Sequence, residues 1–250
     1  MDQFSLQGAG APIFPNLQQE GASGGHDVQL PSIAVFLQFK LSEFMVRRSA
    51  LGATQLGVPH FRFHLRPLKH SKQHNLLREL EAAGNEVYYC APAFHLPSEL
   101  NDAFSSGRVS DRTAYFSPSD IGELPDDDEH FVAFRPDRSP AWLFSEPKEL
   151  HYRTGESVFA PNAQRRLGSV PRRGPRDQVL RDLGDELLNI FERSMMAGVV
   201  DIDGERRLQL SALRRGRTMQ NASRYLGFVS QTLFGCFPLL IPVGLSTNSN

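Results

Sequence analysis

Three polar side chains flank an apolar run near the amino terminus of the chain. Asp27 precedes the run, and Gln38 and Lys40 close it, in the segment GGHDVQLPSIAVFLQFK, residues 24–40. A carboxylate and an amide carbonyl are oxygen ligands of the kind that Mg²⁺ prefers. A lysine beside them can orient a water molecule or neutralise charge that develops on a phosphate. Together these residue types suit metal-dependent hydrolysis of a phosphate ester.

A hairpin would bring the three side chains together. A two-residue turn at Pro31-Ser32 places Asp27 opposite Phe36, and because strand side chains alternate, Gln38 and Lys40 then share the face of Asp27. Pro-Ser is not a favoured two-residue turn. An Asp beside a turn and a Lys at a strand end are also common surface choices. An ordinary hairpin and the metal-binding edge of an active site therefore both remain open.

The pattern resembles the PD-(D/E)XK nuclease superfamily, in which an Asp on one hairpin strand is followed by an (Asp/Glu/Gln)-X-Lys triplet on the next. Asp27 and Gln38-Phe39-Lys40 match these positions. The Gln-X-Lys form is similar to that of restriction and anti-phage defence nucleases. The family order also continues with a helix and a buried strand, which residues 69–85 and 86–94 would provide.

Two further matches to the family lie on either side of the triplet. Glu20 corresponds to the additional acid that many members carry on their first helix, although the segment around it is rich in Gly and has no helical pattern. Gln73 and Leu77 form a Q-X-X-X-L pattern that occurs in some members. The resemblance covers roughly residues 15–95.

The resemblance implies a DNA endonuclease that hydrolyses phosphodiester bonds, in bacterial defence against foreign DNA. Asp27, Gln38 and Glu20 would hold Mg²⁺, or Mn²⁺ in its place, and Lys40 would orient water or phosphate as the fourth catalytic residue. The rival is a catalytically inactive nuclease-like scaffold that binds nucleic acid or a protein partner through its Arg-rich half, or associates with itself.

Histidines offer a third class of function. His70 and His74 are four residues apart on the helix expected over 69–85, which is the spacing of helical zinc pairs. A third ligand is not evident, and polar surface or phosphate contacts are the ordinary alternative. The acidic run at 125–129 is typical of a solvated turn. G-X-S-X-G, Walker and G-X-G-X-X-G motifs are absent, which argues against serine-hydrolase and nucleotide chemistry.

Charge divides the chain, although its formal net charge is only −1. Residues 1–150 are acidic overall and residues 151–250 basic, and every cation of the second part is arginine. Arginine forks suit phosphate, so paired arginines predict sequence-poor contacts with a DNA backbone, against the alternative of a solvated face. The pairs are Arg165-Arg166, Arg172-Arg173, Arg206-Arg207 and Arg214-Arg215.

The two cysteines, Cys90 and Cys236, each lie in an apolar, strand-like run. This favours buried free thiols in a reducing compartment. The amino terminus lacks the pattern of a secretory signal. Residues 228–245 are apolar but contain two prolines, so we expect a helix that leads into a buried strand rather than a membrane span. These observations predict a cytoplasmic protein.

Regular elements that could hold the candidate residues follow from periodicity and turn signals. We expect strands over 61–67, 86–94, 113–121, 130–136 and 236–244, helices over 69–85, 97–104, 175–198 and 218–234, and a hairpin that turns at Asp203-Gly204. The fold class predicted is α/β, with a central mixed β-sheet flanked by helices. Residues 1–150 would form a nuclease-like, restriction-endonuclease-like core with an irregular amino-terminal arm. Residues 151–250 would form an Arg-rich linker and C-terminal helices that pack on it.

Overall fold

The computed structural model describes residues 32–124, 128–137, 140–144, 147–160, 165, 168–198, 210–214 and 221–242. The strands are β1 (Ser32–Phe39), β2 (Glu43–Met45), β3 (His60–Leu65), β4 (Glu86–Pro92), β5 (Thr113–Phe116), β6 (His130–Phe134), β7 (Ala141–Phe144), β8 (Lys148–Leu150) and β9 (Phe237–Pro242). The helices are α1 (Ala53–Leu56), α2 (Gln73–Ala82), α3 (Pro97–Ser105), α4 (Pro118–Ile121), α5 (Gly155–Phe159), α6 (Arg176–Met196) and α8 (Ala222–Phe234).

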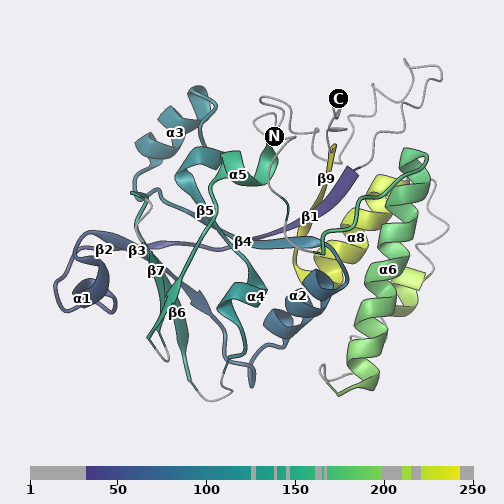
Figure 1. Cartoon of the computed structure of the whole chain (residues 1–250), viewed down its shortest axis with the longest axis horizontal. Coiled ribbons are helices and arrows are strands. Elements are labelled where there is room, and N and C mark those ends of the chain that lie inside the picture. Colours follow the sequence, from purple (N-terminus) through teal and green to yellow (C-terminus); the bar gives the residue numbers. More distant parts are fainter. Residues whose placement is uncertain are drawn as a thin grey trace, which may run out of the picture.

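A mixed sheet of four strands, in the order β5-β4-β1-β9, crosses the middle of the molecule (Figure 1). Its central strand, β1, is apolar on both faces. Ala34 and Phe36 join a core with residues of α2, α6 and α8, whereas Val35 and Leu37 pack on the other side with Val158 of α5. A strand covered on both faces reads as a continuous apolar run, which explains the sequence IAVFL.

The strand pairings of β1 differ from the hairpin expected at Pro31-Ser32. One edge of β1 pairs in parallel with β4 and the other pairs antiparallel with β9. Phe36, the position that the hairpin would pair with Asp27, lies between Val87 and Pro238. Because both edges are occupied, the predicted hairpin pairing is wrong. Asp27 itself lies outside the described residues.

The second sheet is antiparallel and has the strand order β2-β3-β6-β7-β8. Phe61, Phe63 and Leu65 of β3 alternate with polar residues and point into the same core as Phe36 of β1. The two sheets therefore share one hydrophobic core. The opposite face of this sheet carries a smaller cluster that includes Leu56 of α1.

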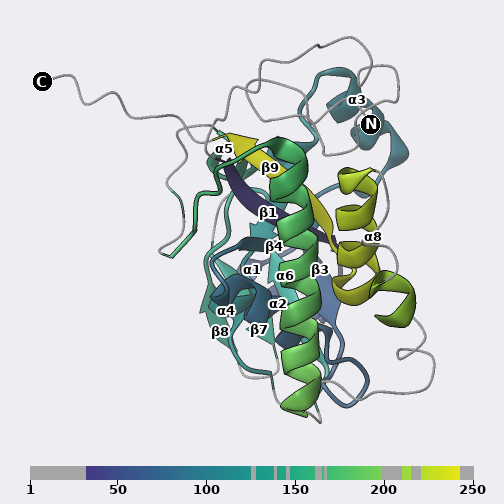
Figure 2. The same ribbon diagram turned by 90° about the vertical axis from the view of Figure 1, so that its right-hand side faces the viewer.

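Helices α2, α6 and α8 cover one face of the mixed sheet, and α6 and α8 lie side by side (Figures 1 and 2). The two helices approach closely at Gly184, where a Cβ atom would meet the ring of Tyr225 at 2.5 Å. The hydroxyl of Tyr225 donates to Asp185 at 2.7 Å, which fixes the pair. The residues described in the structure include no helix that is long and apolar enough to span a bilayer.

An α/β fold with a mixed sheet, an antiparallel sheet and flanking helices is confirmed. Three details differ from the expected elements. Helix α2 begins at Gln73 rather than 69, because Pro67–His70 form a turn. The strand expected over 113–121 ends at Phe116, where Ser117 caps α4. The segment 151–174 includes α5, and the hairpin expected at Asp203-Gly204 lies outside the described residues.

Candidate functional site

Gln38 and Lys40 lie at the carboxyl end of β1 on the face that α2 covers. They continue the row of Ala34 and Phe36, so the alternation predicted from the sequence places both on one face, as expected. The backbone N–H of Lys40 donates to the carbonyl of Cys90 at 2.9 Å, which extends the pairing with β4 beyond the strand. The ammonium of Lys40 lies 5.0 Å from the centre of the Tyr89 ring.

Lys40 is partly buried and its charge is opposed by its surroundings. Burial and, to a smaller extent, the nearby Arg66 guanidinium together lower the pKa of its ammonium to about 8. Within the described part of the chain, no carboxylate forms an ion pair with this ammonium. The aromatic face of Tyr89 stabilises the charged form of the ammonium.

Gln38 is 6% exposed, and its Oε1 atom has no hydrogen-bond partner among the described residues. A buried carbonyl oxygen without a donor is unfavourable by itself, so this atom is available to a ligand. Gly235, with φ of 63°, brings the end of α8 against the amide groups of Gln38 and Gln73. Gln73 donates from Nε2 to the carbonyl of Phe234 at 2.9 Å, which ties the start of α2 to the end of α8.

His74 is buried behind Lys40 and uses both ring nitrogens. Nε2 lies 2.7 Å from the carbonyl of Gly122, and Nδ1 lies 2.9 Å from the hydroxyl of Tyr89. Because a carbonyl only accepts, Nε2 carries the proton, and the Tyr89 hydroxyl donates to Nδ1. Burial lowers the pKa of His74 to about 4, against the opposing effect of the Gly122 carbonyl.

These contacts argue against a zinc pair at His70 and His74, the third class of function considered. His70 lies in the turn before α2, so the two residues are not four apart on one helix. Both nitrogens of His74 are already engaged within the fold. Gln73 and Leu77 do lie on α2, with Leu77 fully buried and Gln73 beside Lys40. The helix therefore contributes packing and polar contacts to the site.

Lys40 lines a pocket of about 250 Å³ that lies between β1, β4 and the start of α2. Its lining is polar and carries two cationic side chains, with Leu65 as the apolar member: Lys40, Leu65, Arg66, Ser71, Gln73, His74 and Tyr89. The amino-terminal end of α2 adds the positive end of its helix dipole to this potential. An anion is the ligand that such a pocket favours.

The predicted acidic ligands are not placed by the structure. Asp27 and Glu20 lie outside the described residues, as do positions 125–127 of the acidic run. Across the described ranges, no group of three His, Cys, Asp or Glu side chains could hold a metal ion. Gln38 and Lys40 are therefore the two predicted catalytic residues that can be located.

Several of the paired arginines make contacts within the fold. Arg165 donates to the carbonyls of Val158 and Ala160. Arg172 pairs with Glu186 at 2.8 Å. Arg214 pairs with Glu192 at 2.7 Å, and the partners Arg166, Arg206, Arg207 and Arg215 lie outside the described residues.

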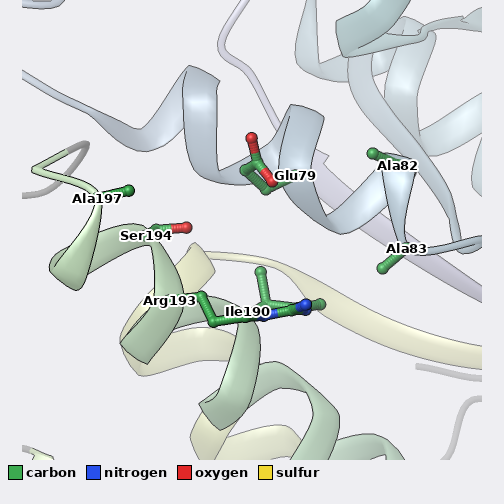
Figure 3. Close-up of a pocket in the computed structure, with 7 residues that line it drawn as sticks. All are labelled: Glu79, Ala82, Ala83, Ile190, Arg193, Ser194 and Ala197. Carbon is green, nitrogen blue, oxygen red and sulfur yellow. The ribbon is translucent and has the colours of Figure 1, made fainter.

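A different pocket, of about 280 Å³, lies at the other end of α2 and faces α6 (Figure 3). Glu79, Ala82 and Ala83 of α2 line it across from Ile190, Arg193, Ser194 and Ala197. Its two charged side chains are of opposite sign and both exposed. It offers no concentration of charge comparable with the pocket of Lys40.

Arg66, Ser71 and Tyr89 were not among the residues expected at the site. The sequence RPLKHSKQH, residues 66–74, contained a signal, because three cations and one histidine directly precede α2 and a second histidine lies in its first turn. Tyr89 gave no such signal, since it reads as one more aromatic residue of a buried strand.

Comparison with protein-family models, with curated proteins and with solved structures finds no match.

Proposed function

We propose that the protein is a metal-dependent nuclease that hydrolyses phosphodiester bonds of DNA, in defence against foreign DNA. The observation that carries the proposal is that Gln38 and Lys40 share one face at the end of β1 and that Lys40 lines a cationic pocket. The parallel pairing of β1 with β4 supports it, because the Gln-X-Lys triplet then closes a buried strand that has a parallel neighbour. In the chain, β2, α1, β3 and α2 lie between these two strands.

The oxygen of Gln38 fits one position of a Mg²⁺ or Mn²⁺ site, because it is buried and has no other partner in the described residues. Asp27 and Glu20 are proposed to supply the carboxylates. When bound, the ion supplies Lewis acidity toward the phosphate and its attacking water. An amide in place of a carboxylate lowers the negative charge of the ligand set, so the proposal depends strongly on Asp27.

Lys40 has the properties of a group that handles a proton or a phosphate charge. Its pKa of about 8 lies close to neutral pH, so the ammonium can release and regain a proton at little cost. In its charged form it stabilises negative charge on a phosphate in a partly desolvated pocket. Tyr89 and His74 line the same pocket and are hydrogen-bonded to each other. The carbonyl of Gly122, which accepts a hydrogen bond from His74, fixes the orientation of this pair.

The test is cleavage of supercoiled plasmid with Mg²⁺ by the wild-type chain and by Lys40→Ala. We expect the variant to lose about a hundredfold or more of the rate, the usual effect of removing one charge-stabilising group. Asp27→Ala should lose activity in the same way, and EDTA should abolish cleavage. Arg108→Ala removes an exposed cation outside the pocket and serves as control. Equal cutting by the wild type and Lys40→Ala would rule out this site.

The second candidate is a nuclease-like scaffold that binds nucleic acid or a protein without hydrolysis. The amide at Gln38 favours it, as does the absence of a cluster of metal-binding side chains from the described residues. DNA binding in EDTA, with no cleavage in Mg²⁺ or Mn²⁺, would identify the scaffold.

A further inference from the structure

A second pocket adjoins that of Lys40 and shares Arg66 with it. It has a volume of about 370 Å³ and lies between the end of β3, the turn before α2 and the residue that precedes β6. It is lined by His64, Arg66, Pro67, Lys69, His70 and Glu129. Arg66 thus lines both pockets, and each pocket also contains a lysine, Lys69 in one and Lys40 in the other.

Cations outnumber carboxylates among the described residues that line this pocket. Arg66 is exposed and has no ion-pair partner among the described residues. The Nε2 atom of His64 is buried without a hydrogen-bond partner in that same part of the chain. Among the described residues that line it, Glu129 is the one carboxylate, and it is exposed. An anion that entered here would be attracted by Arg66 and Lys69 and would give His64 a partner.

The protonation of His64 responds to the same surroundings. Burial lowers its pKa, Glu129 opposes this, and Lys40 and Arg66 lower the pKa further. The cations of both pockets therefore act on one another directly. A phosphate between them would relieve this repulsion, because its charge is attracted by every cation that surrounds it.

We propose that the pocket of His64, Arg66, Lys69 and His70 is a phosphate subsite, which holds a phosphate of the DNA strand next to the one held at Lys40. The inference rests on the proposed function and adds the surface that binds the strand. Two adjoining pockets that share one guanidinium suit two linked phosphates better than a single free ion. The polyanion contact is thereby assigned to the turn before α2 rather than to the Arg-rich C-terminal half.

The test measures DNA binding separately from cleavage, by fluorescence anisotropy of a labelled duplex with the full chain in EDTA. Arg66→Gln with Lys69→Gln removes two pocket cations, and Arg108→Gln with Arg224→Gln removes two exposed cations elsewhere as a matched control. We expect the pocket variant to bind about tenfold more weakly at moderate salt. Its slope of log affinity against log salt should fall by about 0.9 for each phosphate that the variant no longer neutralises. The control variant should match the wild type in both quantities.

Glu129→Gln gives a result of opposite sign. Removal of this acidic side chain from the lining should tighten binding about threefold, since surface charges act through a high dielectric. Unfolding temperatures of all variants should match that of the wild type, because the side chains replaced are exposed.

The outcomes separate the subsite from the proposed hydrolysis. Equal weakening by the pocket and control variants would overturn the subsite, as would an unchanged affinity of the pocket variant. If inorganic phosphate protected the wild type but not the pocket variant from unfolding, while DNA affinity stayed equal, the pocket would take free phosphate and the proposal would fail. If the variants change DNA binding as expected but the wild type does not cut DNA, the proposed hydrolysis is contradicted and the phosphate subsite remains supported.

Discussion

Two buried side chains, Lys40 and His74, illustrate how the candidate site controls charge at the scale of the residue. Burial disfavours the charged form of each, and each pKa is lowered accordingly. The outcomes differ because both ring nitrogens of His74 are hydrogen-bonded, to Tyr89 and Gly122, whereas the ammonium of Lys40 contacts the face of the Tyr89 ring. His74 is therefore a neutral support, and Lys40 is the group whose charge remains available.

Acid should weaken the fold through His74. Its pKa is about 4 when folded, against an ordinary value of 6.5, so the unfolded chain binds more protons between these values. The contribution is fully present above about pH 6.5, and it falls by up to about 3 kcal/mol as the pH drops to 4. Arg78, Lys40 and His130 act in the same direction.

His74→Leu should remove this dependence, although it leaves the Tyr89 hydroxyl without its acceptor. Urea unfolding over a pH series should give a slope of free energy against pH that is lower by up to about 1.4 kcal/mol per unit between pH 4.5 and 6. Exposed His151→Leu controls for the loss of one histidine. An unchanged slope in His74→Leu would show that this histidine does not carry the effect.

At the scale of the element, local patterns in the sequence predicted more than pairings did. The apolar stripe of α6 and the β-branched and aromatic run of β4 each indicate the type of element, because the residues that form the pattern are close in the sequence. The hairpin at Pro31-Ser32 failed because β1 takes β9 as a neighbour, about two hundred residues away. The zinc pair failed because α2 begins after His70, and no local pattern marks where a helix begins when the cap is Lys72.

Within the candidate site, too, local patterns predicted some features and long-range packing determines the others. That Gln38 and Lys40 share a face follows from strand alternation and needs no knowledge of partners. The end of α8, at Phe234 and Gly235, lies beside Gln38 and Gln73. This contact joins distant parts of the chain, so local sequence patterns did not predict it.

Packing of α6 on α8 should depend on the absence of a side chain at Gly184. Gly184→Ala puts a methyl group 2.5 Å from the Tyr225 ring, and overpacking of this kind costs about 1–3 kcal/mol. Higher helix propensity returns about 1 kcal/mol, so a net loss is expected. Urea unfolding measures it. Combining the change with Tyr225→Leu should cost less than the sum of the two single variants, and strict additivity would contradict the clash.

At the scale of the whole molecule, segments from both ends of the described chain build the site together. β9 pairs with β1, and the turn between α8 and β9 lies against Gln38. The chain near residue 172 also contacts the start of β1. The backbone N–H of Ser32 donates to the carbonyl of Arg172 at 2.9 Å, and the N–H of Arg172 donates to the carbonyl of Ser32 at 2.7 Å. Loss of C-terminal packing should therefore affect the mouth of the Lys40 pocket.

The neighbours Arg172 and Arg173 test whether the Arg-rich segment holds the fold or binds DNA. Arg172 is largely buried, donates to Asn85 at 2.9 Å and pairs with Glu186 at 2.8 Å, whereas Arg173 is exposed. Arg172→Ala leaves Glu186 and Asn85 without this partner, so we expect a loss of about 3 kcal/mol in unfolding free energy. Arg173→Ala should change it by less than about 0.5 kcal/mol.

Both arginine variants should keep the salt slope of DNA binding, since the proposed phosphate contacts lie at Arg66 and Lys69. Urea unfolding and anisotropy on the same two proteins separate the possibilities. A slope that falls in Arg173→Ala, with stability unchanged, would move the DNA contact to the C-terminal half. Equal stability of the two variants would show that the Arg172 contacts with Glu186 and Asn85 contribute little to joining α6 to the sheet.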